Sequence, residues 1–138
     1  MSQLVQFLVT IASSASICFG IWHFFVPNAW KWYSYIDIDA TELVLAVRAI
    51  NVFFSLSLIL FGLINILFVY GNKSNSYSIV VMLSATSIFW LTRVVFQLIY
   101  PQGSMNPVLQ YGMLSVFIIV SLCYLISLYL MVSQSHVT

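Results

Sequence analysis

The stretch ELVLAVRAINVFFSLSLILFGLINILFVY, residues 42–70, decides the fold class of this chain. Its charged side chains are Glu42, at its start, and Arg48. The hydrocarbon core of a bilayer is about 30 Å thick, and an α-helix of about 20 apolar residues crosses it. The stretch is longer than that, and a helix satisfies its own backbone hydrogen bonds in lipid. It therefore predicts a transmembrane helix.

Three further apolar stretches flank this one. The four predicted helices are residues 4–26, 42–70, 78–100 and 108–132. Turn-forming residues separate them. Asn106 and Pro107 are expected to be the N-cap and first residue of the last helix, and Thr41 with Glu42 to start the second. Short connections favour antiparallel neighbours, so residues 1–138 are predicted to form one all-α domain, an integral membrane four-helix up-down bundle.

The composition of the whole chain agrees with a membrane protein. Of its 138 residues, 62% are hydrophobic and 5% charged, against about 25% charged in ordinary soluble domains. The formal net charge is +1, without a basic field, so nucleic-acid binding is excluded. Cys18 and Cys123 lie in apolar runs at predicted depths about 10 Å apart, too far for a disulfide. Both are expected to be buried and unpaired.

The connection after the first helix is rich in aromatic side chains. Its central residues are Trp30, Lys31, Trp32 and Tyr33. Tryptophan and tyrosine favour the membrane–water interface, where their rings are half in lipid and half in water. We expect this segment to be an interfacial anchor, and the alternative is a lid over a pocket.

Polar side chains inside the predicted spans gather toward one face of the membrane. Counted at 1.5 Å per residue from the side of the first and third connections, they lie about 6 to 14 Å deep. A polar group in hydrocarbon is costly and normally faces a partner or a cavity, and helical phase places these residues on inward stripes of three helices. The predicted ligand-binding residues are His23, Arg48, Asn51, Trp90, Arg93 and Gln97.

This predicted pocket is rich in hydrogen-bond donors. Arg48 and Arg93 are permanently charged and suit a carboxylate, a phosphate or a pair of carbonyls. We therefore expect a non-enzymatic module that binds membrane lipid, another lipid-like or quinone-like amphiphile, or a partner subunit. In the alternative interpretation one arginine pairs with Asp39 or Glu42 and the other reaches the lipid headgroups.

Several other functions are excluded or left as alternatives. His23 is the only histidine within a predicted span, which excludes haem held by two histidines of one chain. The sequence has no metal-binding cluster and no carboxylate deep in a span, so neither a metal, nor a cofactor, nor proton-coupled transport is predicted. A structural or channel-like homo-oligomer is an alternative, because Ala12, Ser16 and Gly20 form a ridge of small residues suited to close helix packing.

The segment GIWHFFVP, residues 20–27, resembles the G-x-x-H-F-x-x-P signature of small four-helix membrane proteins of the DoxX-like group. The resemblance implies a four-helix membrane fold. Some members of that group are linked to quinone-dependent or thiol-related redox systems, so it also implies a second alternative function, a membrane oxidoreductase or transferase that uses the pocket. His23 is then the candidate proton donor.

The distribution of positive charge predicts the orientation. Lys31, Arg48 and Arg93 lie toward the first connection, and Lys73 lies toward the other side. By the positive-inside rule, the first and third connections face the cytoplasm. Four crossings then place both chain termini together on the non-cytoplasmic side.

Overall fold

The computed structural model consists of four long α-helices and one short 3-10 helix. In chain order they are α1 (Gln3–Ala29), η1 (Trp32–Tyr35), α2 (Thr41–Tyr70), α3 (Ser76–Ile99) and α4 (Pro107–Ser135). The structure describes residues 1–37, 39–71, 74–104 and 106–135, with only the backbone of residue 135, and these ranges contain no strand. All four long helices have the length and apolar composition needed to cross a membrane. The predicted all-α, multi-pass fold is confirmed on those grounds.

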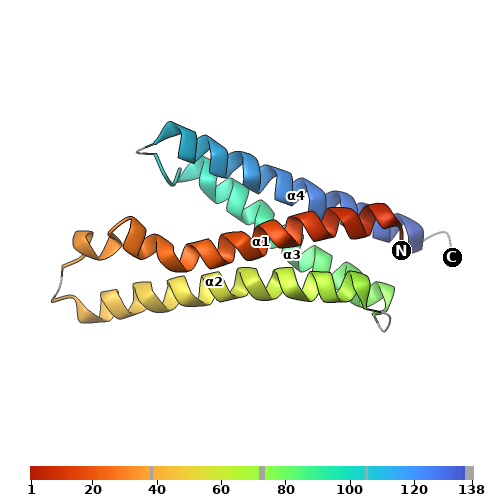
Figure 1. Cartoon of the computed structure of the whole chain (residues 1–138), viewed down its shortest axis with the longest axis horizontal. Coiled ribbons are helices and arrows are strands. Elements are labelled where there is room, and N and C mark those ends of the chain that lie inside the picture. The colour runs from red at the N-terminus through yellow and green to blue at the C-terminus, as the bar shows by residue number, and fades with distance from the viewer. Residues whose placement is uncertain (38, 72–73, 105, 136–138) are drawn as a thin grey trace.

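The helices pack as two pairs, α1 with α2 and α3 with α4, and α1 joins the pairs through its contact with α4. α1 packs most extensively on α2, α3 packs on α4, and α1 also packs on α4. Of the consecutive helices, α2 and α3 pack least, and they diverge from their common connection toward opposite sides of the bundle (Figure 1). Consecutive helices are therefore close antiparallel neighbours in two of the three cases. α1 begins at the end of the bundle where α4 finishes (Figure 1).

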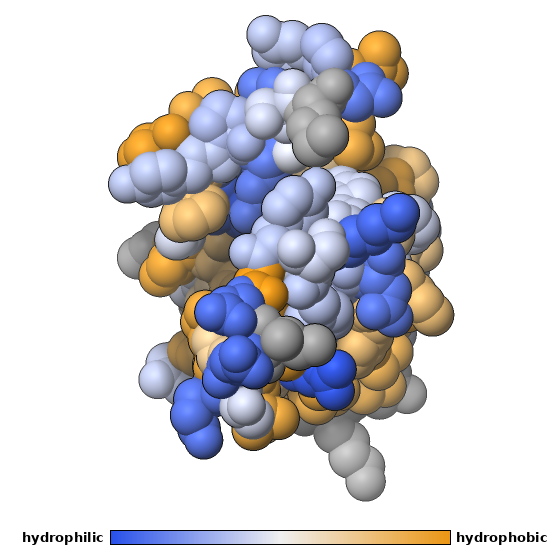
Figure 2. Space-filling model, turned by 90° about the vertical axis from the view of Figure 1, so that its left-hand side faces the viewer, coloured by the Kyte–Doolittle hydropathy of each residue, from blue (hydrophilic) through white to orange (hydrophobic). Residues whose placement is uncertain are grey.

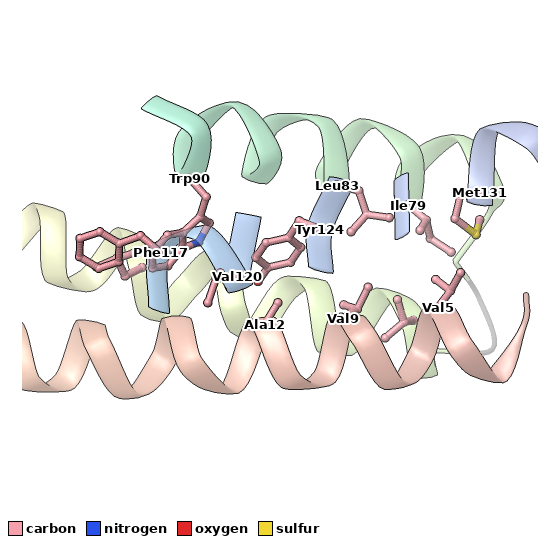
Figure 3. Close-up of a cluster of buried hydrophobic side chains, with 12 residues drawn as sticks. Val5, Val9, Ala12, Ile79, Leu83, Trp90, Phe117, Val120, Tyr124 and Met131 are labelled. Carbon is pink, nitrogen blue, oxygen red and sulfur yellow. The ribbon is translucent and has the colours of Figure 1, made fainter. Parts of the chain in front are cut away.

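A row of buried apolar side chains fills the space between α1, α3 and α4. It runs from Trp90 and Phe117 at one end to Val5 and Met131 at the other (Figure 3). Tyr124 lies within the row and is fully buried. The core therefore lies mainly between α1, α3 and α4. α2 contributes Leu58 and Val69 to the same cluster and also makes a close backbone contact with α1.

Glycine makes that contact between α1 and α2. A Cβ atom on Gly20 would lie 2.8 Å from the carbonyl oxygen of Ser55, and one on Gly62 would lie 2.8 Å from the carbonyl oxygen of Ser13. The two backbones therefore approach as closely as small residues allow. The close packing predicted for the ridge of small residues is confirmed at Gly20, within this chain.

The predicted boundaries can be compared with the structure at the starts of α4 and α2 and at the end of α1. Asn106 Oδ1 accepts a hydrogen bond of 3.0 Å from the Val108 N–H, which confirms the N-cap of α4. α2 begins at Thr41, one residue before the predicted span, but its N-cap is Ala40 and no side chain caps the helix, so the capping role expected of Thr41 is wrong. α1 also continues past Pro27 to Ala29, since a proline in the last turn removes only one helical hydrogen bond.

Both cysteines are unpaired, as predicted, but Cys18 is exposed on α1 and Cys123 is half-buried. The prediction that both are buried is therefore wrong for Cys18. An apolar run does not predict which of its side chains are buried, because a helix in lipid can expose apolar side chains on any face that does not contact another helix.

Candidate ligand-binding cleft

A cleft of about 560 Å³ lies where α2 and α3 diverge. We call it the lateral cleft. Its lining residues are His23 of α1, Trp32 and Ile36 of the first connection, Val47, Ile50, Asn51 and Phe54 of α2, Arg93 and Phe96 of α3, and Gln102 of the α3–α4 connection. Ile50 and Phe96 at its rim are 69% and 46% exposed. Because both residues belong to membrane-spanning helices, the cleft opens sideways toward lipid.

Arg93 is the only permanently charged residue among those that line the lateral cleft. Its Nη2 donates a hydrogen bond of 2.6 Å to Gln102 Oε1, and its Cζ lies 4.7 Å from the centre of the Phe117 ring. Its Nε is buried and has no hydrogen-bond partner. Within the described residues the guanidinium thus has an amide and an aromatic ring as partners but no carboxylate. Its positive charge is not neutralised by any residue that the structure describes.

His23 and Asn51 lie at the inner wall of the same cleft. The Ser55 hydroxyl donates to the Asn51 carbonyl oxygen at 2.7 Å, and Ser55 Oγ lies 3.4 Å from His23 Nδ1. Because a hydroxyl has one proton, Ser55 accepts from His23 in the tautomer that carries the proton on Nδ1. His23 Nε2 is then an acceptor. Asn51 is 6% exposed, and its buried Oδ1 has no partner.

Aromatic rings fix the position of the His23 imidazole. The Phe54 ring lies 4.6 Å from it in an edge-on arrangement, and the Trp32 ring lies 6.2 Å away. Such tilted contacts between rings are favourable and restrict rotation. His23 is therefore held between α2 and the first connection.

Gln97 holds the α3–α4 connection in place and does not line the lateral cleft. It is 2% exposed, and its Nε2 donates a hydrogen bond of 2.9 Å to the carbonyl oxygen of Gln102. Arg93 binds the side chain of the same Gln102. Two residues of α3 thus fasten Gln102 at the cleft. Sequence reasoning missed Gln102 because it lies outside the helical stripes, and only its position one turn beyond Gln97 could have suggested it.

Arg48 and Trp90 are not in the lateral cleft, so the predicted pocket needs correction at both positions. Arg48 is exposed, and its Cζ lies 5.1 Å from the centre of the Tyr33 ring. Successive residues of a helix point about 100° apart, and α2 presents the preceding residue, Val47, to the cleft. Trp90 is 1% exposed and packs 5.7 Å from the Phe117 ring, so it belongs to the core.

The aromatic first connection lies over this end of the bundle. Figure 2 looks onto that end, where hydrophilic and pale side chains gather and hydrophobic ones form much of the rim. The ring of Trp30 lies 6.5 Å from that of Trp32, Lys31 is exposed, and Tyr33 lies beneath Arg48. Trp32 lines the lateral cleft. The segment thus has an interfacial composition, and one of its rings covers the cleft.

Polar side chains nearer the other end of the bundle are hydrogen-bonded to each other. Asn65 Nδ2 donates to Thr86 Oγ1 at 2.9 Å, linking α2 to α3, and the hydroxyls of Ser13 and Tyr124 lie 3.0 Å apart, linking α1 to α4. These residues have a structural role. They differ in this respect from Asn51, whose side-chain oxygen is buried without a partner.

Comparisons with known proteins leave the chain without an assigned family. No protein-family model, curated protein or solved structure matches it. In the part of the chain that the structure describes, no group of three or more histidine, cysteine, aspartate or glutamate side chains could hold a metal ion.

Proposed function

We propose that this multi-pass membrane protein binds a lipid-like or quinone-like amphiphile in the lateral cleft without catalysing a reaction. The polar head of the ligand lies against Arg93, Asn51 and His23. Its apolar tail leaves the cleft between Ile50 and Phe96 and enters the surrounding lipid.

The unneutralised charge of Arg93 is the observation that carries this proposal. A charge removed from water without an opposite charge is destabilising by several kcal/mol, and ionisable residues within membranes are normally functional. A ligand oxygen at the unpartnered Nε would form a charge-assisted hydrogen bond, which is about twice as strong as a neutral one. The ligand therefore supplies the acceptor that the described residues lack.

The size and lining of the cleft support an amphiphile in particular. Its volume of about 560 Å³ lies within the range of roughly 300–1,000 Å³ found for small-molecule sites. Val47, Ile50 and Phe96 provide an apolar wall suited to a hydrocarbon chain. The opening toward lipid gives a hydrophobic ligand direct access from the bilayer.

The chemistry of the lining favours binding over catalysis. Among the described lining residues, His23 is the only general acid or base, and none is a carboxylate, a cysteine or a lysine. Covalent and general acid–base catalysis usually need one of those groups beside a second, orienting one. The arrangement therefore supplies hydrogen bonds more readily than it supplies a reaction.

The test is native mass spectrometry of the protein extracted from membranes in mild detergent. We expect an adduct of lipid-like mass on the wild-type chain that is lost in Arg93→Leu. Arg48→Leu is the matched control, because it removes the same charge from the same end of the bundle but outside the cleft. It should keep the adduct. Asn51→Leu provides a second cleft variant in case Arg93→Leu does not fold. An adduct that persists in both cleft variants would overturn the proposal.

A DoxX-like membrane oxidoreductase or transferase is the second candidate, favoured by one observation. His23 belongs to the segment that carries that resemblance, and it lines the lateral cleft, where its imidazole can exchange a proton with a ligand. On this proposal the amphiphile is a quinone-like co-substrate. His23→Gln should then retain the adduct but abolish its reduction to the quinol by an added dithiol, which is oxidised to the disulfide. On the binding proposal the wild-type chain does not accelerate that reaction either.

A further inference from the structure

A second cavity lies at the membrane–water boundary, at the same end of the bundle as the lateral cleft. We call it the interfacial cavity. It has a volume of about 600 Å³ and lies between the first connection and the α3–α4 connection. Trp32 lines both cavities, so its ring forms part of the wall that separates them. The two cavities are nevertheless lined by different polar groups.

Lys31 is the only charged residue among those that line the interfacial cavity. Its backbone has φ 52° and ψ 40°, the left-handed conformation that residues other than glycine seldom adopt. The N–H and the hydroxyl of Ser34 hold it there by donating to the Lys31 carbonyl oxygen at 3.0 and 2.8 Å. A conformation of this kind costs on the order of 1–3 kcal/mol, and such positions concentrate at ligand sites.

Neutral donors face the same space from the other connection. Asn106 and Ser104 both line the interfacial cavity. Asn106 Oδ1 is occupied by the N–H groups of α4, which leaves its amide N–H groups as the free part of the side chain. Ser104 adds a hydroxyl. The cavity thus combines an ammonium, an amide and a hydroxyl, and none of its described lining residues is a carboxylate.

This set of groups fits the oxygens of a phosphate. Lysine and neutral N–H and O–H donors are common phosphate partners. The rings of Trp30, Trp32 and Tyr35 could in principle hold the cationic group of a choline lipid, but the ammonium of Lys31 in the same cavity would repel it. Aromatic rings at this level also place the cavity where lipid headgroups lie.

We propose that the interfacial cavity binds the phosphate headgroup of an anionic phospholipid. Lys31 pairs with the phosphate, Asn106 and Ser104 donate to its oxygens, and the rings pack beside the glycerol region. This site is separate from the lateral cleft and does not depend on the identity of the ligand there. It assigns a lipid-recognition role to a segment whose composition alone indicates only an anchor.

The test compares lipid binding to the full-length protein by native mass spectrometry during titration with phosphatidylglycerol or with phosphatidylcholine. The wild-type chain should bind phosphatidylglycerol about fivefold more tightly, the gain expected from one lysine near an anionic headgroup. Lys31→Asn should remove that preference. Asparagine tolerates the left-handed conformation, so the variant keeps its fold. Lys31→Arg should restore the preference.

Two controls separate this site from general attraction between charges and from the lateral cleft. Lys73→Gln removes one positive charge from the connection between α2 and α3 and should leave the preference intact. Arg93→Leu removes the charge of the cleft and should leave it intact as well. Asn106→Asp keeps the cap of α4 while it places a carboxylate in the cavity, so it should abolish the preference. The proposal is overturned if Lys31→Asn retains the wild-type preference, or if Arg93→Leu or Lys73→Gln lowers it as much as Lys31→Asn does.

Discussion

The close approach of α1 and α2 at Gly20 predicts the effect of adding a single methyl group. In Gly20→Ala the new Cβ would lie 2.8 Å from the backbone carbonyl oxygen of Ser55, 2.9 Å from Ile59 Cγ1 and 3.0 Å from Leu58 Cβ. Ordinary van der Waals contact begins at 3.4 Å, so α1 and α2 must separate by about 0.6 Å at the carbonyl. A backbone atom cannot rotate away, so the helices themselves must move.

The size of the effect follows from two opposing contributions. Overpacking of this kind costs about 1–3 kcal/mol, whereas replacing glycine by alanine within a helix gains about 1 kcal/mol. Gly112→Ala in α4 is the matched control, because a Cβ there meets no atom within 4 Å. It receives the helical gain without the clash. The difference in free energy of unfolding between the two variants therefore isolates the overpacking cost and should be about 1–3 kcal/mol.

Reversible unfolding in mixed micelles, followed by circular dichroism, measures this difference. Gly112→Ala should be at least as stable as wild type, and Gly20→Ala should be the less stable of the pair. The displacement should also reach the lateral cleft, because the Ser55 hydroxyl contacts His23. Ligand retention should thus fall in Gly20→Ala and not in Gly112→Ala. Equal stability of the two variants would refute the close packing of α1 on α2.

Three further predictions use the same unfolding assay with a control on the same helix. Thr86→Ala should destabilise the protein by about 1–2 kcal/mol because it leaves Asn65 Nδ2 without its partner on α3. Thr92→Ala should have little effect, because the Thr92 hydroxyl bonds only within α3. Equal losses in the two variants would argue against the α2–α3 link. Tyr124→Phe should lower the free energy of unfolding by about 1 kcal/mol through the lost contact with Ser13. Tyr129→Phe should have no measurable effect, because Tyr129 is 71% exposed. Unchanged stability in Tyr124→Phe would contradict the buried link. Asn106→Ala should lower the free energy of unfolding by about 1 kcal/mol, because it removes the cap of α4. Asn106→Asp keeps the cap and should be as stable as wild type. Wild-type stability in Asn106→Ala would show that the cap is dispensable.

The four helices were predictable because lipid imposes a simple rule on the sequence. A run of apolar residues long enough to cross the bilayer is a helix, and residues 42–70 obey this rule with few polar interruptions. The boundaries were less accurate where tertiary structure decides. The backbone continues through Pro27, and it begins α2 without the side-chain cap expected from Thr41.

The lateral cleft was predictable only in part. Depth along the helices correctly grouped His23, Asn51 and Arg93, because rise per residue is the same in every helix. Phase was a weaker guide, since a shift of one residue turns a side chain by about 100° and so exchanged Arg48 for Val47. The divergence of α2 from α3 is a matter of packing between helices, and periodicity within a single helix contains no information about it.

The cleft end of the bundle differs from the rest in having buried polar atoms without hydrogen-bond partners. Among the described residues, five buried side-chain atoms have no hydrogen-bond partner: Asn51 Oδ1, Ser87 Oγ, Arg93 Nε, Gln97 Oε1 and Ser121 Oγ. The two serines can rotate their hydroxyls toward a carbonyl of their own helix. The other three atoms belong to Asn51 and Arg93 in the cleft and to Gln97 behind it, and none has such a local remedy. Since buried polar groups are nearly always satisfied, the two unpartnered atoms of residues that line the cleft, Asn51 Oδ1 and Arg93 Nε, support a bound polar head as the missing partner.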